Sequence, residues 1–147
     1  MWKITSNDNS TKTLIFLDTN ILLNVIKEKW HLESLMHGIT TEAYKFVVPN
    51  FIIEELKIVK EKRTIKNGAL RFAEELTEIF DDTLYLQPSE YPKHIDDRLI
   101  ALVLAVPFKK YVMTQDMALK EKFLQAGLSV ILVTYGKAKL LRPEQKK

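Results

Sequence analysis

The hydrophobic pattern is most distinctive at residues 14–17, which are all large and apolar. A continuous apolar run of this kind is typical of a strand buried on both faces in a parallel sheet. The run ends at Asp18, and Thr19 and Asn20 follow, which are residue types that often begin helices. We therefore predict a helix over 20–29, with Asp18 at the carboxyl end of a central strand, where open α/β sheets place their ligands.

Short apolar runs continue to alternate with helical patterns along the rest of the chain. The pattern predicts further strands over 46–48, 84–86, 111–114 and 130–133. It predicts further helices over 32–44 with an interruption near Gly38, and over 50–62, 68–80, 96–106 and 117–125. Such alternation produces right-handed βαβ units around a parallel sheet. The expected fold class is α/β, a three-layer sandwich with a central parallel sheet of about five strands.

Acidic residues recur where the predicted strands end and helices begin. Asp116 follows the strand over 111–114, and Asp96 and Asp97 open a helix. Each acid also has a structural explanation when taken alone, because Asp caps helices and Asp18 lies in a turn. The carboxyl ends of parallel strands meet at one edge of a sheet, however, so several acids there predict a site for a divalent metal ion.

Helical geometry ranks the acids further, because successive residues turn by about 100° around the helix axis. Glu55 falls at the border of the apolar stripe of its helix, whereas Glu54 lies nearly opposite that stripe. Glu55 is therefore a candidate for the site, with an ion pair to a lysine as its alternative role. Asp96 falls closer to the apolar stripe of its own helix than Asp97 does, and an N-cap is its alternative role.

Composition narrows the class of protein. A chain of 147 residues suits one domain, and its 46% hydrophobic and 28% charged residues are ordinary for a globular protein. The sequence has no cysteine, which excludes disulfides, zinc ribbons and thiol catalysis. Residues 1–12 lack the apolar core of a signal peptide, and no apolar run is long enough to span a bilayer. We therefore expect a soluble cytoplasmic protein that does not bind membranes.

The net charge of +3 is unevenly distributed. The charges of residues 136–147 sum to +4, which leaves −1 on the rest of the chain. We expect one domain over 1–135 and a basic C-terminal tail over 136–147. A second basic cluster lies between Lys57 and Arg71. Both segments are candidate contacts for a phosphate backbone, and a solvated surface is an equal alternative for each.

Four motifs follow one another at a specific spacing. Residues 17–20 read Leu-Asp-Thr-Asn, and residues 49–56 follow the pattern Pro-x-x-x-x-x-Glu-Leu, with Glu55 as its acid. Residues 96–102 are similar to the pattern Asp-Asp-x-Ile-x-x-Leu, with Leu99 at the Ile position, and 112–116 form an apolar strand ending in Thr-x-Asp. In this order, over residues 14 to 133, the motifs resemble the PIN domain, a family of metal-dependent nucleases. Either Asp96 or Asp97 matches the third acid.

The resemblance implies a strand order of 3-2-1-4-5, which places Asp18 and Asp116 on adjacent central strands. The implied activity is phosphodiester hydrolysis by a metal-dependent endoribonuclease. Because all-oxygen ligands favour hard cations, we expect Mg²⁺ or Mn²⁺ as the cofactor. Asp18 and Asp116 are expected to hold the principal ion with Asp96 or Asp97, and Asp96 is favoured. Glu55 is expected to orient a metal-bound water or to complete a second site.

Three uncharged residues complete the predicted site, namely Thr19, Asn20 and Thr114. Thr19 or Asn20 is expected to hydrogen-bond Asp18 and thereby to position it. Thr114, from the Thr-x-Asp motif, is expected to support the acids in the same way.

The resemblance leaves two biological roles open. VapC-type toxins are inhibited by an antitoxin and often dimerise, whereas other PIN proteins process rRNA. The expected partners are therefore an RNA substrate, an antitoxin or a ribosome-assembly partner, and a second copy of the chain. The alternative is a PIN-like module that binds RNA or protein without catalysis.

Three other classes fit the residues poorly. A phosphatase with an Asp-x-Asp nucleophile needs an acid at position 20, where this chain has Asn20. A receiver domain needs its phosphorylated Asp on a middle strand, whereas the strand over 46–48 ends in Pro-Asn. A dinucleotide-binding domain needs a glycine-rich turn after the first strand, and none of the 4 glycines lies there.

Overall fold

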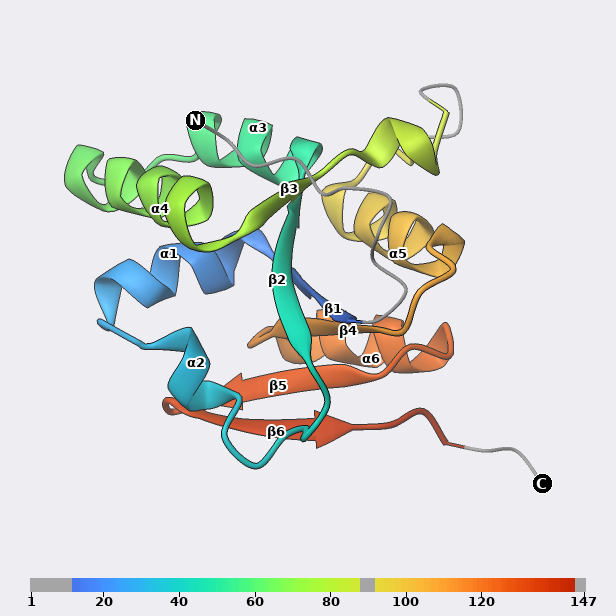
Figure 1. Cartoon of the computed structure of the whole chain (residues 1–147). Coiled ribbons are helices and arrows are strands. Elements are labelled where there is room, and N and C mark those ends of the chain that lie inside the picture. The colour runs from blue at the N-terminus through green and yellow to red at the C-terminus, as the bar shows by residue number, and fades with distance from the viewer. Residues whose placement is uncertain (1–11, 88–91, 145–147) are drawn as a thin grey trace.

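A computed structural model describes residues 12–87 and 92–144 as an α/β fold (Figure 1). Its strands are β1 (Thr13–Leu17), β2 (Tyr44–Pro49), β3 (Glu78–Phe80), β4 (Lys110–Thr114), β5 (Val130–Thr134) and β6 (Lys137–Leu141). Its helices are α1 (Thr19–Lys27), α2 (Leu32–Leu35), α3 (Asn50–Ile58), α4 (Arg63–Leu76), α5 (Ile95–Ala105) and α6 (Met117–Gln125), with a 3-10 turn over Asp82–Leu84. Among the described residues, no helix is long and apolar enough to cross a membrane.

The strands form one sheet in the order β3-β2-β1-β4-β5-β6. The first five strands are parallel, and β6 runs antiparallel to β5. Figure 1 shows α1, α3 and α4 on one side of the sheet, with α5 and α6 on the other. The predicted fold class and the order 3-2-1-4-5 are confirmed, and a sixth strand extends the sheet beyond β5.

The central strand β1 is buried on both faces, as its apolar run predicts. Residues 14–17 have no solvent exposure. β1 lies between β2 and β4, where Ile15 is in register with Phe46 on one side and Tyr111 on the other. The Phe16 ring also meets the Phe80 ring of β3 edge to face, at 5.2 Å between centroids. This packing fixes the end of β1, and therefore the position of Asp18.

The third strand was predicted at the wrong place. It lies at Glu78–Phe80 instead of 84–86, and the helix predicted over 68–80 is α4, which ends at Leu76. Residues 78–80 continue a helical periodicity, but they pair with β2, so tertiary contacts override the local pattern. α4 also runs through Gly68, where a Cβ atom would lie 3.1 Å from Ile26 of α1. The glycine thus allows the two helices to approach closely.

The ends of several helices differ from the prediction. The stretch over 32–44 contains only α2, because Gly38 adopts a left-handed conformation with φ of 81°. The helix over 50–62 ends at Ile58, and its N-cap position is Pro49. α5 begins at Ile95, one residue before the prediction.

The predicted basic tail is partly a strand. β6 takes up residues 137–141 and pairs with β5 along its whole length, so the sheet extends past the expected domain boundary at residue 135. Lys146 and Lys147 of the predicted tail lie outside the described residues, as does most of the segment 1–12.

The pairing of β5 with β6 predicts that the tail stabilises the fold. A chain ending at Tyr135 would leave the backbone of β5 unpaired at the sheet edge, which costs stability and favours association. We expect the free energy of unfolding to fall by about 2 kcal/mol or more, which thermal unfolding should show as a Tm lower by about 5 °C or more. A chain ending at Glu144 is the control and should unfold like the full chain. An unchanged Tm for the chain ending at Tyr135 would contradict this role of β6.

Candidate active site

A small cavity of about 40 Å³ lies where β1 and β4 end, at the carboxyl edge of the sheet. Four of the predicted acids line it, although they come from distant parts of the sequence. They are Asp18 after β1, Glu55 of α3, Asp96 of α5 and Asp116 before α6. Thr19 and Asn20 line the same cavity, whereas Asp97 does not.

Asp18 is held firmly at the base of this cavity. It is only 5% exposed, and its Oδ1 accepts a hydrogen bond of 2.8 Å from the backbone N–H of Ile21, which caps α1. Its Oδ2 accepts a bond of 2.6 Å from the Thr114 hydroxyl. The Thr114 hydroxyl oxygen in turn accepts a bond of 3.1 Å from the backbone N–H of Asp116. Thr114 thus links the two acids that end adjacent strands.

Thr19 and Asn20 do not make the contact that was expected of them. Within the described residues, neither side chain hydrogen-bonds Asp18. The Thr19 hydroxyl is buried without any hydrogen-bond partner, and Asn20 is exposed to solvent. A buried hydroxyl without a partner is energetically unfavourable, so the Thr19 oxygen is available to a ligand in the cavity.

Asp116 combines a capping role with a place in the cavity. Its Oδ1 accepts hydrogen bonds from the backbone N–H groups of Ala118 at 2.9 Å and Leu119 at 3.0 Å, so it caps α6. Its other oxygen, Oδ2, has no hydrogen bond within the described part of the chain. The cap therefore fixes the carboxylate while leaving one oxygen for a ligand.

Each of the two adjacent acid pairs has one member that lines the cavity. Glu55 lines the cavity, while Glu54 is exposed and pairs with Lys57 at 3.3 Å. Asp96 lines the cavity, while Asp97 lies 3.8 Å from Lys122. Asp96 is more exposed to solvent than Asp97. It therefore lines the cavity because of the direction of its side chain, and not because it is more deeply buried. Neither acid caps α5, because that helix already begins at Ile95.

The cavity is strongly negative. Burial raises the pKa of Asp18 from 3.8 to about 6, against the lowering effect of the hydrogen bonds from Thr114 and Ile21. The charges of Asp96 and Asp116 add to the increase. The pKa of Asp96 is also raised, by burial and then by the charge of Asp116, although Lys122 lowers it. Without a cation, ionisation of Asp18 and Asp96 is therefore less favourable than in water.

The donor atoms of the cavity fit a hard divalent cation. All of them are oxygens, one buried hydroxyl lacks a partner, and the carboxylates repel one another. The side chains are not gathered into a complete ligand set, because no three Asp, Glu or His residues of the described chain are arranged to hold an ion. A cation in this cavity would be held by Asp18, Asp116 and Asp96 after their side chains move closer together, and this assignment stays a prediction.

Residues 15–135 match the family model of the PIN-like domain. The chain belongs to the PIN-like domain family. No curated protein matches the chain in sequence. The solved structures that resemble this PIN-like domain in fold include the following two.

The first is described as the PIN domain endonuclease Utp24. It has a TM-score of 0.69 and 22% identity, and the match covers 88% of this chain and 91% of that one. The second is VapBC2 from Rickettsia felis, bound to a DNA fragment from its promoter. It has a TM-score of 0.50 and 18% identity, over 74% of this chain and 92% of that one. At these identities the two structures support the PIN fold alone.

The raised pKa of Asp18 predicts an unusual pH dependence of stability. The folded state keeps a proton on Asp18 up to about pH 6, whereas the unfolded chain loses it near 3.8. Without metal, stability should therefore fall as pH rises from 4 to 7, by on the order of 3 kcal/mol from this group. Asp18→Asn should remove that part of the slope and raise the Tm at pH 7. Chemical denaturation in EDTA at several pH values measures how the free energy of unfolding depends on pH, and thermal unfolding measures the Tm. The same pH dependence in the two proteins would contradict the raised pKa of Asp18.

Proposed function

We propose that this PIN-like domain is an endoribonuclease that hydrolyses phosphodiester bonds of RNA with Mg²⁺ or Mn²⁺. The observation that carries the proposal is the gathering of four acids, from four separate elements, around one small cavity. The raised pKa of Asp18 supports it, because perturbed carboxylates in a cavity are typical of sites that bind cations or perform catalysis. The fold that the chain shares with a described PIN domain endonuclease agrees with this chemistry.

Each acid has a role that follows from its contacts. The hydrogen bonds from Ile21 and Thr114 orient the Asp18 carboxylate, and the α6 cap orients that of Asp116. A bound divalent cation would acidify the attacking water and neutralise charge on the leaving oxygen. Asp96 would complete the ligands of the ion. Glu55, at the edge of the cavity, would accept a proton from the water or hold a second ion.

Exposed lysines suit the phosphates of an RNA substrate. Lys137 and Lys139 of β6 are exposed, as is Lys57 of α3, the helix that carries Glu55. Two kinds of partner suit a PIN-like domain of this size, namely an antitoxin, often with a second copy of the chain, or a ribosome-assembly partner. A small antitoxin gene next to the gene for this chain would favour the first role.

The proposal predicts metal-dependent cleavage of RNA. Labelled single-stranded and structured RNAs should be cut with Mn²⁺ or Mg²⁺ and not with EDTA. Asp18→Asn should slow cleavage by at least about 100-fold, because a principal ligand is lost. This variant should fold, since Asn can still accept from the Ile21 N–H and donate to the Thr114 hydroxyl.

Neighbouring acids provide matched controls for that experiment. Glu55→Gln and Asp96→Asn should reduce cleavage, whereas Glu54→Gln and Asp97→Asn should leave it unchanged. Wild-type activity in Asp18→Asn would refute the assigned site. RNA binding without cleavage under any metal would instead favour a non-catalytic binding module.

A bound cation should also stabilise the folded protein. Mg²⁺ or Mn²⁺ should raise the Tm, because a bound ion relieves the repulsion among Asp18, Asp96 and Asp116. The free energy of unfolding should increase by RT ln(1 + [L]/Kd), where [L] is the concentration of free metal ion. At 100 times Kd this amounts to about 3 kcal/mol. Differential scanning fluorimetry at pH 7.5 measures the shift, which EDTA should reverse. The Asp18→Asn protein should respond far less, and an equal shift in both proteins would place the ion elsewhere.

A further inference from the structure

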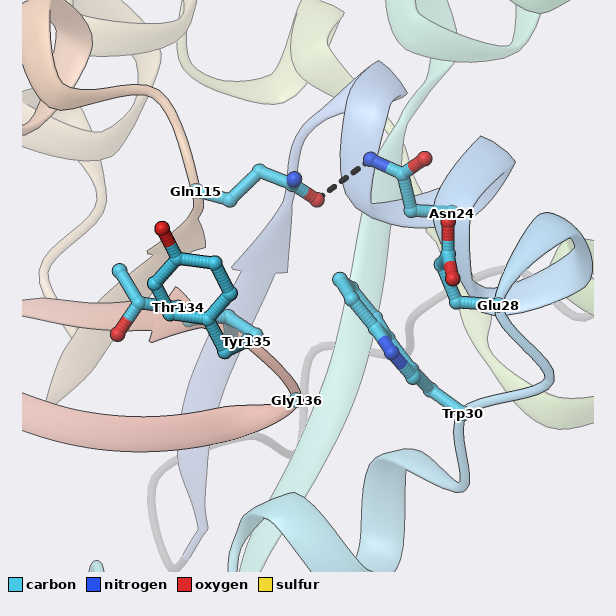
Figure 2. A pocket seen from close by; sticks show the side chains of 8 residues that line it. Asn24, Glu28, Trp30, Gln115, Thr134, Tyr135 and Gly136 are labelled. Carbon is cyan, nitrogen blue, oxygen red and sulfur yellow. Dashed lines mark hydrogen bonds between the residues drawn. The ribbon is translucent and has the colours of Figure 1, made fainter.

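A larger cavity, of about 530 Å³, opens at the same edge of the sheet as the acidic cavity. Figure 2 shows the side chains of Trp30 and Tyr135 around this space, together with Asn24 and Gln115, whose amides are joined by a hydrogen bond. Asn24 Nδ2 donates to Gln115 Oε1 at 2.5 Å. The volume lies within the range of about 300–1,000 Å³ that is usual for small-ligand sites. We call this cavity the aromatic pocket.

The aromatic pocket adjoins the acidic cavity through two elements. Gln115 immediately precedes Asp116 at the end of β4. Asn24 follows Asn20 by four residues on α1, so the two side chains lie on the same helix face, one turn apart. A nucleotide next to one whose phosphate reaches the acids would therefore meet the pocket.

The chemistry of the lining suits a base and not a phosphate. The residues that line the pocket, all within the described chain, include no Lys or Arg and include the acid Glu28. The hydrogen bond between Asn24 and Gln115 uses one N–H and one carbonyl lone pair, so the two amides keep three N–H groups and three lone pairs for other partners, whichever of them donates. The pocket thus offers both hydrogen-bond donors and acceptors beside aromatic rings, which is what an unpaired nucleobase requires.

Tyr135 occupies its position against the local backbone preference. Thr134 pairs with Lys137, so Tyr135 and Gly136 form a two-residue hairpin turn, with φ of 50° and 74°. Both values are positive, as in a type I′ turn, which strongly favours Asn-Gly. Tyrosine at the first position is strained, and its side chain is fully exposed and buries nothing. Strain of this kind is typical of functional positions, and here it presents a ring at the mouth of the pocket.

The rings of Trp30 and Tyr135 are free to receive a planar ligand. Neither ring contacts another aromatic ring within the described residues. Trp30 is half-buried against the core, which fixes one of its faces. A second cavity, of about 430 Å³, shares Trp30 and Gly136 with the pocket and includes Lys137. A positive charge therefore lies beside the pocket, on the side away from the acids.

We propose that the aromatic pocket binds one unpaired base of the RNA substrate, beside the phosphate that is cleaved. The base stacks on Trp30 and Tyr135, and its edge hydrogen-bonds the amides of Asn24 and Gln115. Lys137 then contacts the next phosphate along the strand. This inference rests on the ribonuclease function proposed above, and it makes single-stranded RNA the substrate class.

Tyr135→Asn separates binding from stability. Asn-Gly is the favoured type I′ pair, so this variant should fold with a Tm equal to or above that of the parent protein. The parent carries Trp2→Phe, because the chain has two tryptophans and Trp30 must be the only fluorescent reporter. Single-stranded oligoribonucleotides titrated in EDTA should quench Trp30, and Tyr135→Asn should raise their Kd by roughly 5- to 100-fold. Leu104→Gln, a change at an exposed position of α5, should leave the Kd unchanged.

The preference of the protein among the four bases tests the proposed hydrogen bonds from the amides of Asn24 and Gln115. Titrations with four homopolymeric oligonucleotides should rank the bases, and Asn24→Ala should flatten that ranking. If Tyr135→Asn binds RNA as tightly as its parent and Trp30 is not quenched, the aromatic pocket is not a base site, even when RNA cleavage is intact. If the parent neither binds nor cleaves RNA, the ribonuclease proposal and the pocket proposal fail together.

Discussion

The burial of the Asp18 carboxylate is the constraint on which the site depends. A carboxylate is costly to bury, and this one is kept by two hydrogen bonds, from the Ile21 N–H and the Thr114 hydroxyl. The first bond caps α1, and the second ties the end of β1 to the end of β4. The Thr114 hydroxyl oxygen also accepts a hydrogen bond from the backbone N–H of Asp116. The same contacts that end the strands therefore place the acids, so that fold and site form one hydrogen-bonded unit.

The sequence predicts the central part of this arrangement well, because the signals there are local. The apolar run before Asp18 indicates a doubly buried strand, and helical geometry separates Glu55 from Glu54. The third and sixth strands could not be located in this way. Residues 78–80 continue a helical pattern and become β3 only by pairing with β2. β6 was obscured by its lysines, which suit an exposed edge strand as well as a tail.

Some features of the candidate site can be predicted from the sequence, and others cannot. Acids at strand ends are visible in the sequence, and so are the motifs around them. Thr114 is expected to support the acids because it belongs to the Thr-x-Asp motif, but the sequence does not show which groups it bonds. Its bond to Asp18 and the partnerless Thr19 hydroxyl depend on distances between strands. The aromatic pocket cannot be found from any local pattern, because Trp30 and Tyr135 line the same pocket only after β5 and β6 form their hairpin.

The proposed function rests on one claim, that the buried acids form a site for a divalent cation. NMR titration of the Asp18 side-chain carboxyl carbon tests this claim most directly. In EDTA, the pKa should be about 6, and saturating Mg²⁺ should lower it well below that value. An ordinary pKa near 3.8 in EDTA, or a raised pKa that Mg²⁺ leaves unchanged, would contradict the claim.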